Sequence, residues 1–111
     1  MHIIFESRDA DGNHLRELAI QRVQFVMRRL SWLVPRAKVQ LADTNGPRGG
    51  VDKRCQVELR TDGAGTVVIT AVARDWRTAL DRALGRASRV LLRSWRREQK
   101  TTRTRLQVIG T

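Results

Sequence analysis

The sequence predicts an α+β domain with the element order β-α-β-β-β-α, in which a four-stranded mixed sheet carries two helices on one face. Four short segments have the alternation or the β-branched composition that is typical of strands. Two longer segments repeat apolar residues at spacings of three and four, as helices with one buried face do. Because each helix has a single apolar stripe, the economical packing places both helices on the same face of the sheet.

The first strand is predicted over residues 2–8 (HIIFESR), which are rich in β-branched and aromatic side chains. The next residues have the composition of a turn, and Asp11 and Asn13 are both candidates to cap the helix that follows. That helix is predicted over residues 14–34. We expect it to end there because Pro35 disfavours helical geometry in the residue before it.

The other three strands follow in the middle of the chain. Residues 36–43 and 52–60 alternate between apolar and polar side chains, which predicts strands with one face exposed to solvent. The connection at residues 44–51 holds three glycines and a proline and is predicted as a flexible loop. Residues 61–65 contain an Asp-Gly pair that is typical of a hairpin turn, and residues 65–74 form the fourth strand. The inward-facing residues of the two alternating strands are Ala37, Val39, Leu41, Cys55, Val57 and Leu59.

The second helix, predicted over residues 75–97 with Asp75 as its cap, carries an unusual charge pattern. Its arginines form a stripe of their own, and like charges at spacings of three and four repel one another. The only acidic residue inside the run, Asp81, lies away from them. Solvated faces usually mix signs, so this face indicates a polyanionic partner. The apolar stripe is Ala79, Leu80, Ala83, Leu84, Ala87, Val90 and Leu91, and the arginine stripe is Arg82, Arg86, Arg89, Arg93 and Arg96, with Arg97 at its edge.

The rest of the chain agrees with a polyanionic partner. Its 111 residues include 22 Lys and Arg against 11 Asp and Glu, a formal net charge of +11, which suits a nucleic acid or an acidic membrane surface. At 1.5 Å per residue the stripe from Arg82 to Arg96 spans roughly 21 Å, enough to meet several phosphates. Arginines of the first helix, outside its apolar stripe or at its margins, are expected to extend this surface: Arg16, Arg22, Arg28 and Arg29.

Several other classes of protein are disfavoured. A hydrophobic content of 41% argues against a disordered chain. No apolar run approaches 18 residues and no charged leader precedes an apolar segment, so we expect neither a membrane span nor a signal peptide. A single cysteine, Cys55, excludes an internal disulfide and a multi-cysteine zinc site. These features predict a cytoplasmic protein in a reducing compartment.

Catalysis has little support in the sequence. The two histidines are isolated, and Cys55 alternates inward on a strand, which favours an inert buried thiol. The glycine-rich loop lacks the spacing of a P-loop. Aspartates at turns and strand ends are explained by capping, although a pair of them could hold Mg²⁺ in a nuclease. We expect no cofactor, no resident metal and no small-molecule substrate.

Three tryptophans invite the hypothesis of base stacking. Trp95 lies near the edge of the apolar stripe of its helix, and Trp76 sits at a helix start where it can cover the sheet, so packing is favoured for both. Trp32 lies off the apolar stripe of the first helix. It is the best candidate for stacking on a base.

The order of elements and the passage 65–97 resemble the ribosome hibernation-promoting factor family, which includes the ribosome-associated inhibitor. In that family a pattern like D-M-Y-x-A-I-D opens the last helix, where this chain has DWRTALD at residues 75–81. The resemblance covers residues 1–97. Two departures are Arg77, which replaces the usual tyrosine, and Phe25, which stands at a commonly basic position. The basic helix positions of the family fall on Arg16, Arg22, Arg28, Arg86, Arg89, Arg93 and Arg97.

The resemblance implies a fold similar to a double-stranded-RNA-binding domain over residues 1–98. The polar and basic composition of residues 99–111 predicts a flexible tail. The resemblance also implies a short-form factor, a monomer when free and without the family's C-terminal dimerisation domain. Such a protein binds 16S rRNA in the decoding channel of the small ribosomal subunit. It blocks translation during stress by occupying that channel, and no membrane partner is expected. Two other hypotheses stay open: a general double-stranded nucleic-acid-binding module without ribosome preference, and a metal-dependent nuclease.

Overall fold

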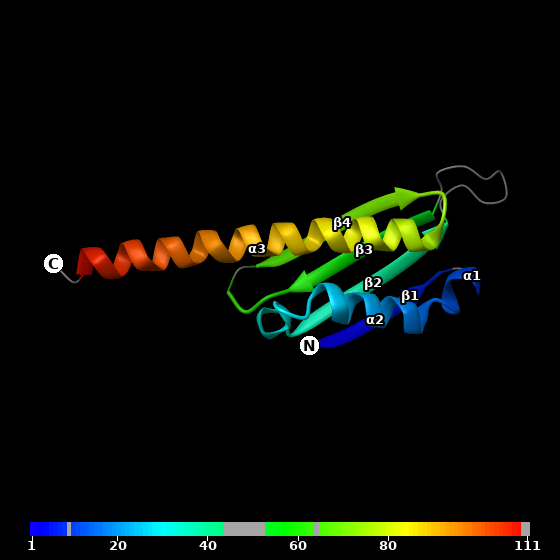
Figure 1. The fold of residues 1–111 in the computed structure, drawn as a ribbon, viewed down its shortest axis with the longest axis horizontal. Coiled ribbons are helices and arrows are strands. Elements are labelled where there is room, and N and C mark those ends of the chain that lie inside the picture. The colour runs from blue at the N-terminus through cyan, green and yellow to red at the C-terminus, as the bar shows by residue number, and fades with distance from the viewer. Residues whose placement is uncertain (9, 44–52, 64, 110–111) are drawn as a thin grey trace.

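The chain forms a four-stranded sheet followed by a long helix that runs across it (Figure 1). The computed structural model describes residues 1–8, 10–43, 53–63 and 65–109, with the backbone alone over residues 10–11 and 98–109. The strands are β1 (His2–Ser7), β2 (Arg36–Asp43), β3 (Lys53–Arg60) and β4 (Thr66–Ala73). The helical elements are α1 (Ala10–Asn13), α2 (Arg16–Val26), the 3₁₀ turn η1 (Ser31–Leu33) and α3 (Trp76–Ile109).

The sheet has the strand order β1-β2-β3-β4. β1 pairs with β2 in parallel, and the two later pairs are antiparallel, which agrees with a helical crossover after β1 and a hairpin after β3. The register aligns Phe5, Val39, Val57 and Ile69 in one row across the four strands. The predicted α+β class and mixed sheet are confirmed, with α1 and η1 as additional short elements.

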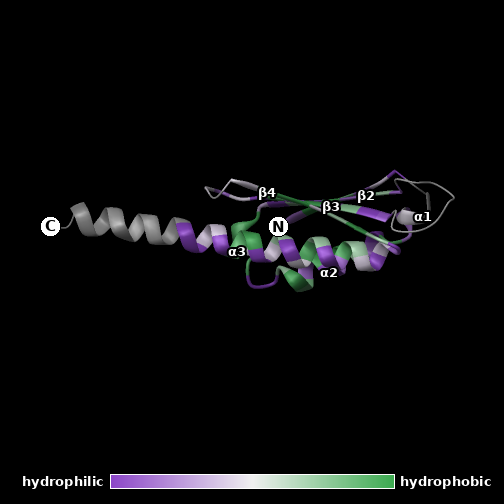
Figure 2. Cartoon of the chain, turned by 90° about the horizontal axis from the view of Figure 1, so that it is seen from above, coloured by the Kyte–Doolittle hydropathy of each residue, from purple (hydrophilic) through white to green (hydrophobic). Residues whose placement is uncertain are grey.

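The core lies between the sheet and the helices, and Figure 2 shows α2 and α3 on the same side of the sheet. The strand residues predicted to face inward are all buried, and the apolar stripe of α3 is buried except for Val90, which is partly exposed. Three residues of that stripe are alanines, so the backbone of α3 can approach the sheet closely. Over the part of α3 whose side chains are described, the fully or almost fully buried residues are Ala79, Leu80, Ala83, Leu84, Ala87 and Leu91.

The first long helix is shorter than predicted. α2 ends at Val26 and the chain continues through turns into η1, so the single helix expected over residues 14–34 is wrong. Beyond α2 the hydrogen bonds join residues three apart, from Leu30 N–H to the Met27 carbonyl and from Leu33 N–H to the Leu30 carbonyl, each at 2.9 Å. Apolar residues spaced by three fit 3₁₀ turns as well as an α-helix, so the spacing does not distinguish the two.

The start of α2 also differs from the prediction. Its N-cap is Leu15, which makes no side-chain cap hydrogen bond, so the capping expected from Asp11 or Asn13 is wrong. The chain makes the short turn α1 instead, and Leu15 N–H donates to the Gly12 carbonyl at 3.1 Å. A Cβ at buried Gly12 would clash with Oγ of Ser7, so a larger residue there would force the Ser7 side chain at the end of β1 to move.

The hairpin between β3 and β4 is confirmed. Thr61 N–H donates to the Gly65 carbonyl at 3.1 Å, and Gly63 and Gly65 have φ values of 119° and 82°, which only glycine adopts readily. The last helix is longer than predicted, because α3 continues past Arg97. The loop predicted over residues 44–51 lies outside the described residues, and the division between a domain and a flexible tail stays a prediction.

Candidate nucleic-acid interface

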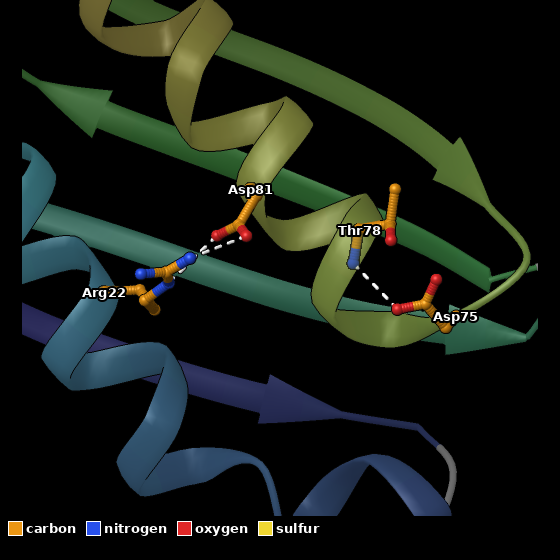
Figure 3. Close-up of polar contacts among 4 residues, drawn as sticks. All are labelled: Arg22, Asp75, Thr78 and Asp81. Carbon is orange, nitrogen blue, oxygen red and sulfur yellow. Dashed lines mark hydrogen bonds and ion pairs between the residues drawn. The ribbon is translucent and has the colours of Figure 1, made fainter.

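The first turn of α3 is anchored by its cap and by an aromatic ring. The backbone N–H of Thr78 donates to Oδ2 of Asp75 at 3.1 Å, as Figure 3 shows, so the predicted cap is confirmed. Hydrogen bonding from Thr78, through its side chain first and its backbone N–H second, lowers the pKa of Asp75. Trp76 packs partly buried against the core, with Nζ of Lys53 at 5.2 Å from its ring centre. These contacts, together with the buried alanines, fix the direction in which the remaining side chains of α3 point.

We define the α3 arginine face as the six arginines of the predicted stripe: Arg82, Arg86, Arg89, Arg93, Arg96 and Arg97. All six side chains are exposed. Arg82 extends toward the edge of the sheet, where Nη1 donates to the Val72 carbonyl at 3.2 Å. Arg86, Arg89, Arg93 and Arg96 form neither a hydrogen bond nor an ion pair with the part of the chain that the structure describes. Four cations in succession therefore lie open to solvent.

Arg22 of α2 is tied to α3 by an ion pair that crosses between the helices. Its Nε donates to Oδ1 of Asp81 at 3.0 Å and its Nη2 donates to Oδ2 at 2.8 Å, which makes the pair bidentate (Figure 3). The hydrogen bond to Asp81 and the charge of its carboxylate raise the pKa of Arg22. Arg22 was predicted as a nucleic-acid contact, but its positive charge is balanced within the fold.

Arg16 and Arg28 of the first helical region each lie beside an aromatic ring, and their side chains, like that of Arg29, are exposed. The guanidinium of Arg16 lies 5.4 Å from the ring centre of Phe5. That of Arg28 lies 4.5 Å from the ring centre of Phe25, and its Nη1 donates to the Phe25 carbonyl at 2.9 Å. Cation–π contacts at exposed sites are weak, so these side chains remain available to an anionic ligand.

The α3 arginine face and the arginines of the first helical region lie on different sides of the contact between α2 and α3. Asp81 and Trp95 mark the side of α3 that faces α2 and η1, because their partners there are Arg22 and Trp32. At 100° per residue the centre of the α3 arginine face lies about a third of a turn away from that side. The α3 face therefore points outward and toward the β4 edge, and the first-helix arginines flank it across the Arg22–Asp81 pair.

The opposite face of the sheet has a mixed charge pattern. Glu6 accepts a hydrogen bond from Nε2 of Gln40 at 2.9 Å and lies 3.7 Å from Nζ of Lys38. These neighbours, Gln40 first, lower the pKa of Glu6. Arg60 pairs with Glu58 at 3.6 Å on the same face. Because acids and bases alternate there, the α3 arginine face is the more specific feature for a polyanion.

Catalytic chemistry finds no support among the described residues. Burial raises the pKa of the Cys55 thiol to about 12, so it is protonated and inert at neutral pH. Across the described ranges, no three His, Cys, Asp or Glu side chains are grouped in a way that could hold a metal ion. Nor does any described helix combine the length and apolar character that crossing a bilayer needs.

Sequence reasoning missed two contacts of this region. Arg22 and Asp81 are 59 positions apart, so no local pattern links them, although each lies off the apolar stripe of its helix. Trp95 was expected to pack at the edge of its helix, and it contacts Trp32, which was considered only as an exposed residue. A search for opposite charges and for aromatic residues on the facing flanks of two helices could have suggested both pairs.

Comparison with solved structures identifies the architecture. A ribosomal subunit interface protein from Coxiella burnetii matches with a TM-score of 0.68 and 15% sequence identity, over 84% of this chain and 96% of that one. The N-terminal domain of Thermus thermophilus Protein Y matches with a TM-score of 0.66 and 22% identity, over 84% of this chain and 98% of that one. The shared property is the fold. No protein-family model matches the sequence, and no curated protein does.

Proposed function

We propose that this protein is a ribosome-binding translation inhibitor, a hibernation factor that occupies the decoding channel of the small ribosomal subunit. Its arginine-rich helices contact the phosphates of 16S rRNA. It acts by occupancy, with the exposed cations of its site holding the rRNA. In this proposal the protein is cytoplasmic and is a monomer until it binds the subunit.

The α3 arginine face is the observation that carries the proposal. A row of exposed guanidinium groups, four of them without a partner among the described residues, matches the regularly spaced charges of a nucleic-acid backbone. Arginine also binds phosphate in a bidentate manner, which lysine cannot do. Arg16, Arg28 and Arg29 would extend the contact, whereas Arg22 would contribute less because Asp81 already balances its charge.

Two further facts favour a ribosomal partner over other nucleic acids. One solved structure with this fold is named a ribosomal subunit interface protein. The DWRTALD passage, which resembles the opening of the last helix in the hibernation-promoting family, begins α3 itself. The residues on which the resemblance depends are therefore in the same helix as the arginine face.

The proposal is tested by reversing three charges on α3 and three elsewhere. The test variant is R86E/R89E/R93E. The matched control is R8E/R36E/R54E, in which Arg36 and Arg54 lie on the opposite face of the sheet and Arg8 follows β1. Both variants change the net charge equally, and none of the reversed side chains makes a hydrogen bond or an ion pair among the described residues; Arg8 acts on Glu6 only through its charge. Binding is measured by co-sedimentation with purified small subunits at physiological salt, with excess bulk RNA as competitor.

We expect one-to-one binding by the wild type and the control and no binding by the folded α3 variant. Undiminished binding by the α3 variant would refute the assignment of α3. An equal loss in both variants would leave net charge alone as the cause. If the competitor abolishes wild-type binding, the protein is instead a general nucleic-acid-binding module without ribosome preference.

A further inference from the structure

An exposed pair of tryptophans lies where η1 meets α3. Trp32 is 67% exposed, the largest value among the large apolar residues that the structure describes. Its ring centre lies 5.9 Å from that of Trp95, with an angle of 89° between the two planes. In such an edge-to-face contact Trp95 covers at most one face of the Trp32 ring. The other face is left without an aromatic partner.

The orientation of the Trp32 ring is fixed although the ring is not buried. Its Nε1–H donates to the Arg29 carbonyl at 3.1 Å, and Trp95 holds it from the side of α3. The single polar atom of the indole is therefore satisfied within the protein. What remains toward solvent is a positioned aromatic surface with a face open to a stacking partner.

The charges around this pair indicate the chemistry of its ligand. The sequence has no acidic residue between Glu17 and Asp43, nor between Asp81 and Glu98, and each tryptophan lies in one of these purely basic stretches. Arg28 and Arg29 precede Trp32, and the exposed Arg96 follows Trp95 in α3. Aromatic rings beside arginines are the combination with which proteins hold unpaired bases on a phosphate backbone.

We propose that Trp32, held in place by Trp95, stacks on an unpaired RNA base. This inference rests on the proposed function, because the arginines must bring an RNA chain to this surface. It adds a distinct type of contact: the arginines bind phosphates in any nucleic acid, whereas the ring requires a base that is free of its duplex. The protein therefore prefers RNA with single-stranded positions over a continuous duplex of equal charge.

The test compares two single-stranded RNA probes of equal length and equal charge. One is an oligoadenylate, and the other has the same sugar-phosphate chain with abasic positions in its central part. Wild-type protein is expected to bind the oligoadenylate about fivefold or more tightly, because stacking on an aromatic side chain contributes at least about that factor per base. The W32L variant keeps an apolar side chain and is expected to lose this preference while binding the abasic probe as the wild type does.

The matched control is F25L. Phe25 is similarly exposed, at 59%, and lies in the same basic stretch, but Arg28 already covers its ring. We expect F25L to keep the preference for bases, and W95L to reduce it because the Trp32 ring loses its support. Quenching of tryptophan fluorescence by the oligoadenylate and not by the abasic probe, absent in W32L, is the expected spectroscopic signature. Circular dichroism checks that each variant is folded.

Each other outcome overturns the inference in a different way. If the wild type binds the two probes equally, the pair does not stack on bases, and a protein contact becomes the explanation for its exposure. If F25L loses the preference as fully as W32L, the effect is not specific to the tryptophan pair. If the wild type binds neither probe and no subunit, the proposed function itself fails.

Discussion

Neutralising Arg86 and Arg93 gives the sharpest quantitative test of the α3 arginine face. The two side chains are seven positions apart and so lie roughly 10 Å from each other along α3. Neither makes a described hydrogen bond or ion pair, so replacing both with glutamine removes two cations without removing an internal contact. The variant should therefore fold normally, and its lower charge repulsion should leave α3 at least as stable.

The expected change in binding follows from counterion release. Each phosphate contact adds about 0.9 to the slope of log K against log salt on duplex RNA or DNA, and about 0.7 on single strands. If each arginine meets one phosphate, R86Q/R93Q should have a slope that is shallower by about 1.4 to 1.8. Between 50 mM and 200 mM salt, a slope lower by 1.8 reduces the loss of affinity by roughly twelvefold.

The assay is fluorescence anisotropy with a labelled 16S rRNA fragment at several salt concentrations, repeated with intact small subunits. The control variant R36Q/R54Q loses the same charge from the opposite face of the sheet and should keep the wild-type slope. A folded R86Q/R93Q protein whose slope equals that of the wild type would show that phosphates do not meet these residues. An equal decrease in both variants would indicate diffuse attraction instead of a defined interface.

Four further outcomes are expected. G85A should raise the stability of the fold by about 0.5 to 1 kcal/mol in thermal unfolding, because Gly85 lies inside α3 and a Cβ there would meet nothing nearer than 3.9 Å. D81N should release Arg22 for binding and steepen the salt slope by up to about 0.9, and an unchanged slope would mean that Arg22 faces no phosphate. The carboxylate of Asp75 has a pKa below its ordinary value of 3.8, so its contribution to stability is present above that pH and is lost as the pH falls through the lower folded pKa. Acid unfolding curves of D75A should lack this part of the pH dependence. Cys55 should not react with a thiol reagent at pH 8 until denaturant is added, and fast labelling of the native protein would contradict its burial.

The sheet and the buried side of α3 could be predicted because the signals that determine them are local. Alternation in residues 36–43 gives the bounds of β2 and its buried side chains, since every second residue of a strand faces the same way. The spacing of alanines and leucines in α3 likewise gives the face that meets the sheet. The arginine stripe could be placed as exposed for the same reason, because it is the complement of that buried face.

Other features depend on contacts between distant segments, which local patterns do not contain. The end of α2 at Val26 reflects a change to 3₁₀ hydrogen bonds with no change in apolar spacing. The ion pair of Arg22 with Asp81 depends on how α2 lies beside α3, and so does the contact of Trp32 with Trp95. The sequence could therefore indicate which cations are present but not which of them the fold already neutralises.

The succession of like charges on α3 has a consequence for how ionic strength acts on this protein. The free protein carries the mutual repulsion of its arginines, a few tenths of a kcal/mol for each neighbouring pair, and added salt screens that repulsion. The same salt weakens any complex with a polyanion. Salt should thus raise the melting temperature of the isolated chain while lowering its affinity for RNA. A bound polyanion would relieve the repulsion directly and stabilise the folded chain more than salt does, so that ligand and fold reinforce each other.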